Sequence, residues 1–194
     1  MNNLKLKKRI LEISKKLGLS HIGSCLSVLP ILEEIYAKKK RKDIVLMDNG
    51  HASLAHYVVL ESLGGKNAEE MFHKHGVHAN RDVENGLYAS NGSLGHNGGI
   101  SIGLSLANRN RICYTIFSDG SIQEGTFYEV CRIRNELKLF NMKCYFNING
   151  FTAVSKIDKD ELVKKIKFLC PDANIRLTFN GEGFDGVQGH YKKL

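Results

Sequence analysis

Two apolar runs constrain the fold of this chain more than any other feature: RICYTIF at 111–117 and KCYFNI at 143–148. Neither run alternates regularly between apolar and polar side chains, which is typical of a parallel strand covered on both faces. A helix is expected between them, over residues 124–139. Strands that alternate with helices predict an α/β fold with a mainly parallel sheet and helices on both faces, in three αβα layers.

The rest of the chain extends this pattern. Further helices are expected over 4–17, 28–40, 51–63, 99–108 and 159–169, and further strands over 43–47 and 174–179. Pro30 is expected in the first turn of its helix. The stretch 73–90 is expected to be irregular, and the glycine-rich tail 180–194 to be a loop. No repeat, low-complexity tract or linker interrupts the sequence, so we predict one domain over residues 1–194.

The composition excludes several classes of protein. A chain of 194 residues, 42% of them apolar, buries enough surface to fold without disulfides. Its first residues are too polar for a signal peptide, and no apolar run approaches the length of a membrane span. We therefore expect a cytoplasmic protein without membrane contact. The five cysteines are scattered and lack C-x-x-C spacing, which favours buried reduced thiols.

The formal net charge of +8 raises the question of a nucleic-acid partner. The lysines are spread over solvated helix faces, such as 38–42 and 164–167, and no aromatic residues are interleaved with them. The charge is also consistent with the attraction of phosphorylated substrates. We expect no binding to nucleic acid.

Two oxygen-bearing side chains follow the two apolar runs. Asp119 lies just past 111–117, and Asn149 lies just past 143–148. Ligands of open parallel sheets bind beyond the carboxyl ends of the strands, so the two side chains are expected side by side on one rim. Magnesium prefers such oxygen ligands and usually binds phosphate oxygens and water beside them. Gly120, which has no side chain, would let a diphosphate approach the backbone closely. Taken alone, an Asp-Gly pair after a strand is more often a turn and helix cap than a metal site.

The sequence around Asp119 carries a family resemblance. Residues 118–125, SDGSIQEG, with Asn149 downstream, resemble the thiamine-diphosphate motif, which is G-D-G, a spacer of similar length and then N. The QEG extension is similar to that of transketolases. Ser118 in place of the first glycine is a departure that the motif easily tolerates.

Four further motifs occur in the transketolase order. SHIGSCLS at 20–27 resembles G-H-P-G-S-S-L-S, NGHA at 49–52 resembles K-G-H-A, and GSLGH at 92–96 resembles G-S-L-G-H-G. His78 stands at the place of the histidine in G-H-P-E. The tail 181–190 is similar, more loosely, to a late G-x-G…H segment. The resemblance covers residues 4–155 well.

The resemblance implies a thiamine-diphosphate-binding fold of the type that holds the diphosphate group. It implies that Asp119, Asn149 and the carbonyl of Phe151 bind Mg²⁺ (or Ca²⁺ or Mn²⁺), which in turn binds the diphosphate of thiamine diphosphate. The cofactor-binding positions that it implies are His51, Gly92, Ser93, Leu94, Asp119, Gly120, Ser121, Glu124, Asn149 and Phe151. The helix after residues 92–94 is expected to point free N–H groups into the site, where they favour anions. Glu124 and Glu129 match glutamates at the family's dimer interface, although acids are common in a first helical turn anyway.

Half of the histidines fall on family positions that contact cofactor or substrate. The resemblance implies catalytic roles for His21, His51, His78 and His190. Neutral imidazoles pass protons to and from sugar hydroxyls and bind the oxyanion formed on carbonyl attack. The other histidines have no such match and are expected to be ordinary surface or core residues: His56, His73, His75 and His96.

The activity that the resemblance implies is transfer of a two-carbon ketol unit from a ketose to an aldose, with sugars or sugar phosphates as substrates. In transketolases a second domain binds the aminopyrimidine ring and supplies the activating glutamate, and no segment here resembles it. We therefore expect the N-terminal subunit of a split transketolase, with a pyrimidine-binding partner subunit in an α₂β₂ complex. Two alternatives stay open: another thiamine-diphosphate-dependent C–C lyase or decarboxylase, and a non-catalytic cofactor-binding relic.

Two further departures concern the site. Ala79 and Asn80 replace the P-E that follows the histidine of G-H-P-E, close to the family's substrate channel. This weakens the expectation of the usual sugar-phosphate substrates. Asn147 replaces an acid that is common at this point in the family.

Overall fold

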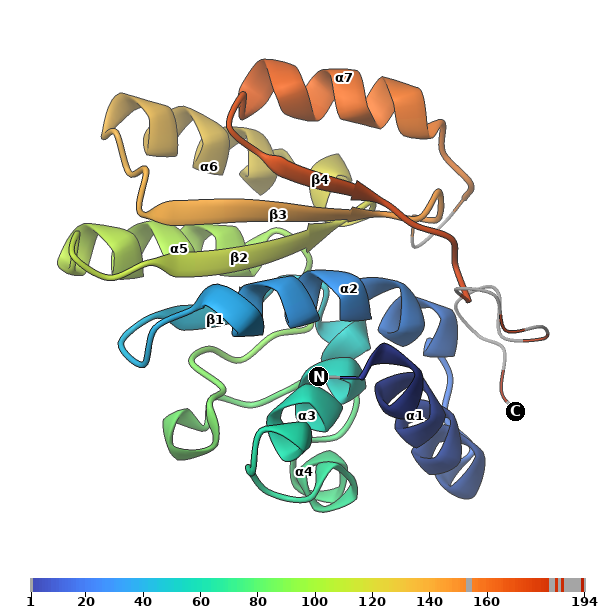
Figure 1. Ribbon diagram of the computed structural model, residues 1–194. Helices are drawn as coiled ribbons and strands as arrows, with labels where there is room; N and C mark the ends of the chain where they lie inside the picture. Colours follow the sequence, from blue (N-terminus) through green and yellow to red (C-terminus); the bar gives the residue numbers. More distant parts are fainter. Residues whose placement is uncertain (1, 153–154, 182–183, 185, 187–192, 194) are drawn as a thin grey trace.

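A sheet of parallel strands forms the middle of the molecule (Figure 1). The computed structural model describes residues 2–152, 155–181, 184, 186 and 193. Within these residues the sheet has the order β1-β2-β3-β4, with strands β1 (Ile44–Met47), β2 (Cys113–Ser118), β3 (Met142–Ile148) and β4 (Asn174–Leu177). Each neighbouring pair is parallel, and helices cover both faces. The predicted three-layer α/β fold is confirmed.

The first helices of the chain cover one face of the sheet (Figure 1). They are α1 (Asn3–Leu17), α2 (Ile22–Lys38), α3 (Ser53–Ser62) and α4 (Ala68–His75). α2 lies next to the sheet, and the other three pack behind it. Alternate strand residues point to this side, because successive side chains of a strand face opposite ways. Val45, Met47, Ile116 and Tyr145 belong to the apolar core shared with these helices.

The opposite face is covered by α5 (His96–Ala107), α6 (Gly125–Glu136) and α7 (Lys159–Leu169). Phe117 and Phe146 are register neighbours in β2 and β3, and their rings stack with centroids 5.3 Å apart. Phe127 of α6 packs edge-on against both rings, at 5.5 and 5.7 Å. These rings form the centre of the second core, which joins β2 and β3 to α6 and α7.

The structure corrects the predicted start of α2. The helix begins at Ile22 rather than Val28, so Pro30 lies inside it and not in its first turn. α2 starts early because His21, in the left-handed conformation with φ at 61°, turns the chain directly into the helix. A proline inside a helix removes one intrahelical hydrogen bond. The buried side chains of Leu26 and Leu29 hold this part of α2 in place.

Helix α4 is a second correction, because part of its span was expected to be irregular. Asn67 caps it by accepting hydrogen bonds from the N–H groups of Glu69 (3.0 Å) and Glu70 (3.2 Å). The remaining elements are single 3-10 turns: η1 (Gly50–Ala52), η2 (Val83–Asn85) and η3 (Ser121–Gln123). In the described part of the chain, every helix is too short or too polar to cross a membrane.

The carboxyl ends of the strands meet at one edge of the sheet, because all neighbouring strands are parallel. The chain leaves this edge through the segments 48–52, 119–124 and 149–152, which follow β1, β2 and β3. Parallel sheets bind their ligands beyond this edge. The candidate site residues gather there.

Candidate active site

Asp119 and Asn149 follow neighbouring strands and are hydrogen-bonded to each other. Ser118 at the end of β2 pairs in register with Asn147 of β3, so the two chain segments leave the sheet side by side. The Asp119 carboxylate accepts hydrogen bonds from the backbone N–H groups of Asn149 (2.9 Å) and Gly150 (3.0 Å). The two residues therefore share one rim of the sheet.

The Asp119 carboxylate is fully buried, at 0% exposure. Burial raises its pKa, although hydrogen bonds from the backbone of Asn149 and Gly150 and the charge of Lys159 act in the opposite direction. A buried carboxylate is costly to keep ionised unless a cation or hydrogen-bond donors compensate it. A cation at this position would stabilise the ionised form of Asp119.

The ligands predicted for a metal ion are few. Among the described residues, no three histidine, cysteine, aspartate or glutamate side chains come together in a way that could hold a metal ion. The expected set of Asp119, Asn149 and the Phe151 carbonyl offers one carboxylate, one amide oxygen and one backbone oxygen. Mg²⁺ bound by so few protein oxygens takes the others from phosphate and water. The donor set therefore suits a metal that is bound together with a diphosphate.

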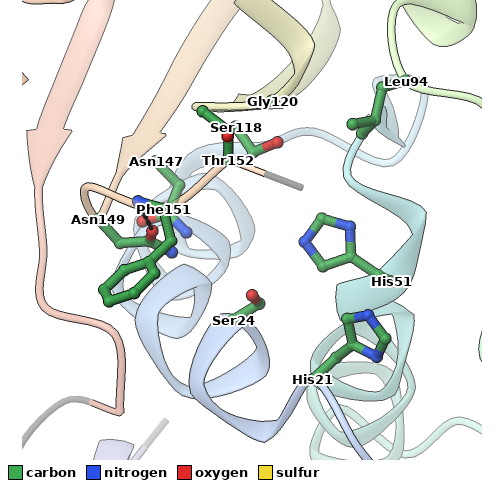
Figure 2. A pocket seen from close by; sticks show the side chains of 10 residues that line it. All are labelled: His21, Ser24, His51, Leu94, Ser118, Gly120, Asn147, Asn149, Phe151 and Thr152. Atoms are coloured by element: carbon green, nitrogen blue, oxygen red, sulfur yellow. Dashed lines mark hydrogen bonds between the residues drawn. The ribbon is translucent and has the colours of Figure 1, made fainter. Parts of the chain in front are cut away.

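A cavity opens at this edge of the sheet (Figure 2). Together with the solvent at its mouth it encloses about 460 Å³ of empty space. Asn147, Asn149 and Phe151 form one wall, and His21 and His51 stand on the other. The full lining is His21, Ser24, His51, Leu94, Ser118, Gly120, Asn147, Asn149, Phe151 and Thr152. The cavity thus combines imidazole, hydroxyl and amide groups. Two predicted metal ligands, Asn149 and Phe151, line it, whereas the buried Asp119 lies behind the lining, next to Gly120 in the chain.

His21 and His51 are brought together from separate segments. Their ring centroids are 5.5 Å apart, with the planes tilted by 43°. The left-handed backbone of His21 is uncommon for a residue other than glycine, and strained residues of this kind cluster at functional sites. The Oγ of Ser20 lies 2.9 Å from Nδ1 of His21 and so helps to fix the orientation of the ring.

The segment 91–94 passes close to the turn that carries His51. A Cβ on Gly50 would lie 2.5 Å from Oδ1 of Asn91 and 2.6 Å from the nitrogen of Gly92, so only glycine fits there. Gly92 in turn lies against the ring of His78, at 3.2 Å from Cγ to a Cβ built on Gly92. His78 therefore lies beside the predicted cofactor-binding segment, although it does not line the cavity itself.

Asp48 occupies the N-terminus of α5. Its two carboxylate oxygens accept hydrogen bonds from the backbone N–H groups of Gly95 (2.7 Å) and Asn97 (2.9 Å). The prediction that α5 offers free N–H groups to a bound anion is wrong for these two groups. The Asp48 carboxylate is the anion at this end of the helix. It satisfies the two N–H donors and interacts favourably with the positive end of the helix dipole.

Three further predicted residues do not line the cavity. Ser93 and Glu124 are exposed, and Glu124 lies against Gly95. Ser121 is buried, and its hydroxyl accepts a hydrogen bond from the N–H of Ser118 at 3.0 Å. His190 lies outside the described residues.

Comparisons with known proteins agree on one family. The chain is 29% identical over 165 residues to a subunit of the apulose-4-phosphate transketolase of Phocaeicola vulgatus, and the match covers 74% of this chain and 58% of that protein. It is 25% identical over 197 residues to the transketolase of Mycoplasma genitalium, and this match covers 86% of the chain and 29% of that enzyme. It is 24% identical over 205 residues to the 6-deoxy-6-sulfo-D-fructose transketolase subunit SqwG of a Clostridium species, with 95% and 72% covered. The chain is similar in sequence to transketolases. No protein-family model matches it.

Solved transketolases share the fold. A transketolase variant from Pichia stipitis superimposes with a TM-score of 0.72 at 16% identity, over 98% of this chain and 38% of that one. The transketolase of Leishmania mexicana superimposes with a TM-score of 0.68 at 17% identity, over 91% of this chain and 36% of that one. The chain spans a little more than half of the Phocaeicola protein and well under half of the Mycoplasma, Pichia and Leishmania transketolases.

Two serines outside the predicted set of site residues, Ser24 and Ser27, contribute to the candidate site. Ser24 is 2% exposed, its hydroxyl has no hydrogen-bond partner among the described residues, and Figure 2 shows it directed into the cavity. Ser27 binds the side chains of Asn147 and Asn149. Both serines lie in the SHIGSCLS motif, and their helical spacing places them on one side of α2. That spacing was the available signal, but it becomes visible only once the helix is known to begin at Ile22.

Proposed function

We propose that this chain is the diphosphate- and metal-binding subunit of a transketolase-like enzyme that uses thiamine diphosphate and Mg²⁺. The observation that carries the proposal is the placement of Asp119 and Asn149 on one rim of the sheet, beside a cavity walled by His21 and His51. The homology to transketolases supports the same assignment. We further propose that residues 1–194 form a single diphosphate-binding domain.

The residues at the cavity suit the proposed cofactor. Asp119, the side-chain oxygen of Asn149 and the carbonyl of Phe151 would hold the metal ion, with Ca²⁺ or Mn²⁺ able to substitute for Mg²⁺. Gly120 lines the cavity and would donate its backbone N–H to a phosphate oxygen. The unpartnered, buried hydroxyl of Ser24 is a further group that a bound molecule would satisfy. Bound thiamine diphosphate would supply the nucleophilic carbon that attacks the carbonyl of a ketose.

The histidines would bind the sugar and transfer protons to and from its hydroxyl groups. His21 and His51 face each other across 5.5 Å at the cavity wall, where they are able to bind hydroxyl groups and to accept or return their protons. His78 lies beside Gly92 and would act from the neighbouring segment. We extend the same role to His190, on the resemblance of the tail alone.

The substrates of two relatives indicate which sugars to test. One relative is named for apulose-4-phosphate and another for 6-deoxy-6-sulfo-D-fructose, and both are sugars with an anionic group. The net charge of +8 would attract such substrates. We therefore propose an anionic ketose as the donor of the two-carbon unit and an aldose as the acceptor.

We propose that a second chain completes the enzyme. Two relatives are named as subunits of transketolases, and this is the main support for a partner. The partner would bind the aminopyrimidine ring and supply the activating glutamate, in an α₂β₂ assembly. We place the assembly in the cytoplasm, since the five cysteines are all free and buried.

Reconstitution tests this proposal. The chain would be mixed with the product of a neighbouring reading frame that encodes a pyrimidine-binding transketolase domain, together with thiamine diphosphate and Mg²⁺. Ketol transfer from anionic ketoses to aldoses is expected only from the mixture. Activity on 2-oxo acids instead of ketoses would identify a decarboxylase or lyase. Binding of thiamine diphosphate by the mixture without turnover of any ketose or 2-oxo acid would contradict the proposed activity and favour a non-catalytic cofactor-binding relic.

A further inference from the structure

We propose that Ser27 is a positioning residue that orients the side-chain amide of Asn149, so that the amide oxygen rather than the amide nitrogen faces the metal ion. This inference rests on the function proposed above. Ser27 lies in α2, whereas the predicted metal ligands Asp119 and Asn149 follow strands β2 and β3. Ser27 is fully buried, at 0% exposure, in the helix that lies next to the sheet.

The hydroxyl of Ser27 stands between two asparagine side chains. Its Oγ accepts a hydrogen bond from Nδ2 of Asn147 at 2.9 Å and another from Nδ2 of Asn149 at 3.3 Å. It donates its own proton to the backbone carbonyl of Ser24 at 3.2 Å. A hydroxyl has one proton and two acceptor sites, so all its capacity is used.

The direction of these hydrogen bonds follows from groups that can act in only one way. The Ser24 carbonyl can only accept, so the single proton of Ser27 is directed to it. Ser27 is then left as an acceptor toward both asparagines, which must present their NH₂ groups to it. On the other side of Asn149, the Phe151 N–H can only donate, and it lies 3.0 Å from Oδ1. Ser27 and Phe151 therefore select the same orientation of the Asn149 amide from opposite ends.

A second contact strengthens the arrangement. The Thr178 hydroxyl, just past β4, donates to Oδ1 of Asn147 at 2.7 Å, which keeps the NH₂ group of Asn147 on Ser27. Thr178, Asn147, Ser27 and Asn149 are 3%, 1%, 0% and 6% exposed. Water has little access to compete for these hydrogen bonds. The network thus runs from Thr178, just past β4, through Asn147 of β3 and Ser27 of α2 to the predicted metal ligand Asn149.

The orientation of the amide matters because its two ends differ chemically. Mg²⁺ and Mn²⁺ accept the amide oxygen as a ligand, whereas the amide NH₂ group has no lone pair to offer. Without Ser27, the buried NH₂ group loses its acceptor, and only the hydrogen bond from the Phe151 N–H to Oδ1 still favours this orientation of the amide. Removing a partner that orients a metal ligand typically costs roughly 10- to 100-fold in metal affinity.

The test measures Mn²⁺ binding to the full chain in the presence of thiamine diphosphate, by the electron paramagnetic resonance of free Mn²⁺. Ser27→Ala is expected to weaken Mn²⁺ binding by roughly 10- to 100-fold. The same substitution is then made together with Asn149→Asp, because a carboxylate presents oxygen at both ends and has no orientation to lose. In that background Ser27→Ala is expected to change the affinity by no more than about twofold, within the additivity of uncoupled sites.

A purely structural role for Ser27 would lower Mn²⁺ affinity equally in both backgrounds, and that result would overturn the inference. Equal affinities of Ser27→Ala and the unaltered chain would also overturn it. If the unaltered chain binds no Mn²⁺ with thiamine diphosphate, either alone or mixed with the proposed partner chain, the proposed metal site itself fails, which is a distinguishable outcome. Thermal unfolding of each variant establishes that it is folded.

Thr178 provides a second route should Ser27→Ala fail to fold. Thr178→Val removes the hydroxyl and keeps the shape of the side chain, and it is expected to weaken Mn²⁺ binding. Thr178→Ser keeps the hydroxyl and is expected to bind Mn²⁺ as tightly as the unaltered chain does. Equal affinities of these two variants would contradict the network. Ser105→Ala is the matched control, because Ser105 is a fully buried serine whose carbonyl is bound by Asn141 near the start of β3, away from the cavity.

Discussion

Oδ2 of Asp48 lies 2.7 Å from the backbone nitrogen of Gly95, so the end of β1 is joined directly to the turn that begins α5. The other carboxylate oxygen binds the N–H of Asn97 at 2.9 Å, and the Asn97 side chain returns a hydrogen bond to the carbonyl of Met47 at 2.8 Å. Burial raises the pKa of Asp48. The position of residues 92–94 at the cavity thus depends on a carboxylate that does not line it.

Asp48→Asn is expected to destabilise the chain by about 1–3 kcal/mol, because the amide has one acceptor oxygen and leaves one of the two buried N–H groups unsatisfied. Urea denaturation of the two proteins measures the difference. Asp160→Asn, at an exposed position in the first turn of α7, is the control and should change stability by less than about 1 kcal/mol. Equal effects at the two positions would contradict the role of Asp48.

Gly50→Ala is expected to weaken the binding of thiamine diphosphate and Mg²⁺, since the added Cβ would displace Asn91 and Gly92. Overpacking of this kind typically costs about 1–3 kcal/mol of stability as well. Isothermal titration calorimetry and thermal unfolding measure the two effects. Gly103→Ala is the matched control, because nothing lies within 4 Å of its Cβ position and alanine favours a helix by up to about 1 kcal/mol.

The buried His56 is expected to make the chain less stable in acid. Burial, with a smaller contribution from the charge of Lys39, lowers the pKa of His56 from 6.5 to about 4. Its ring nitrogen lies 2.6 Å from the hydroxyl of Tyr36. Between these two pH values the unfolded chain binds the proton and the folded chain does not, so stability is full above pH 6.5 and falls as the pH drops toward 4.

The loss attributable to His56 is roughly 3 kcal/mol over this interval. It is measured as the difference between the original chain and His56→Gln in urea denaturation at neutral pH and near pH 4.5. The variant should lose less stability on acidification. Parallel curves for the two proteins would show that His56 does not titrate in this window.

His51→Ala is expected to lower kcat/KM of the reconstituted enzyme by roughly 100- to 10,000-fold, the usual contribution of a proton-transferring group. His73→Ala is the control, because His73 is exposed and lies 3.7 Å from Glu69, away from the cavity. Steady-state kinetics with an anionic ketose donor measures both variants. Unchanged kcat/KM in His51→Ala would remove His51 from the proposed chemistry.

The sequence predicted those elements whose signals are local. β2 and β3 follow the apolar runs, and α7 has the predicted bounds because Asp158 caps it and its apolar residues recur at helical spacing. The proximity of Asp119 and Asn149 also follows from a general rule about parallel strands. These inferences need no knowledge of which segments pack together.

Features that depend on distant residues could not be predicted in this way. Asp48 satisfies the start of α5 from the far end of β1, and local sequence around either residue does not indicate the pairing. Ser27 acts on Asn149 across a gap of more than a hundred residues. Pro30 favours a helix start because proline usually breaks helices, but tertiary packing of α2 outweighs that preference.

The all-parallel sheet has a consequence for how the protein reaches its native state. Ile44 of β1 pairs with Cys113 of β2, and each later strand pair is also separated by at least one whole helix. None of the four described strands pairs with another as a hairpin, and chains whose contacts are this far apart in sequence fold slowly. The contacts of Asp48 with Gly95 and of Asp119 with Asn149 close only after these strands have paired. A nascent chain therefore acquires its cavity late in folding, and until then it has no binding site through which a ligand could speed or rescue the process.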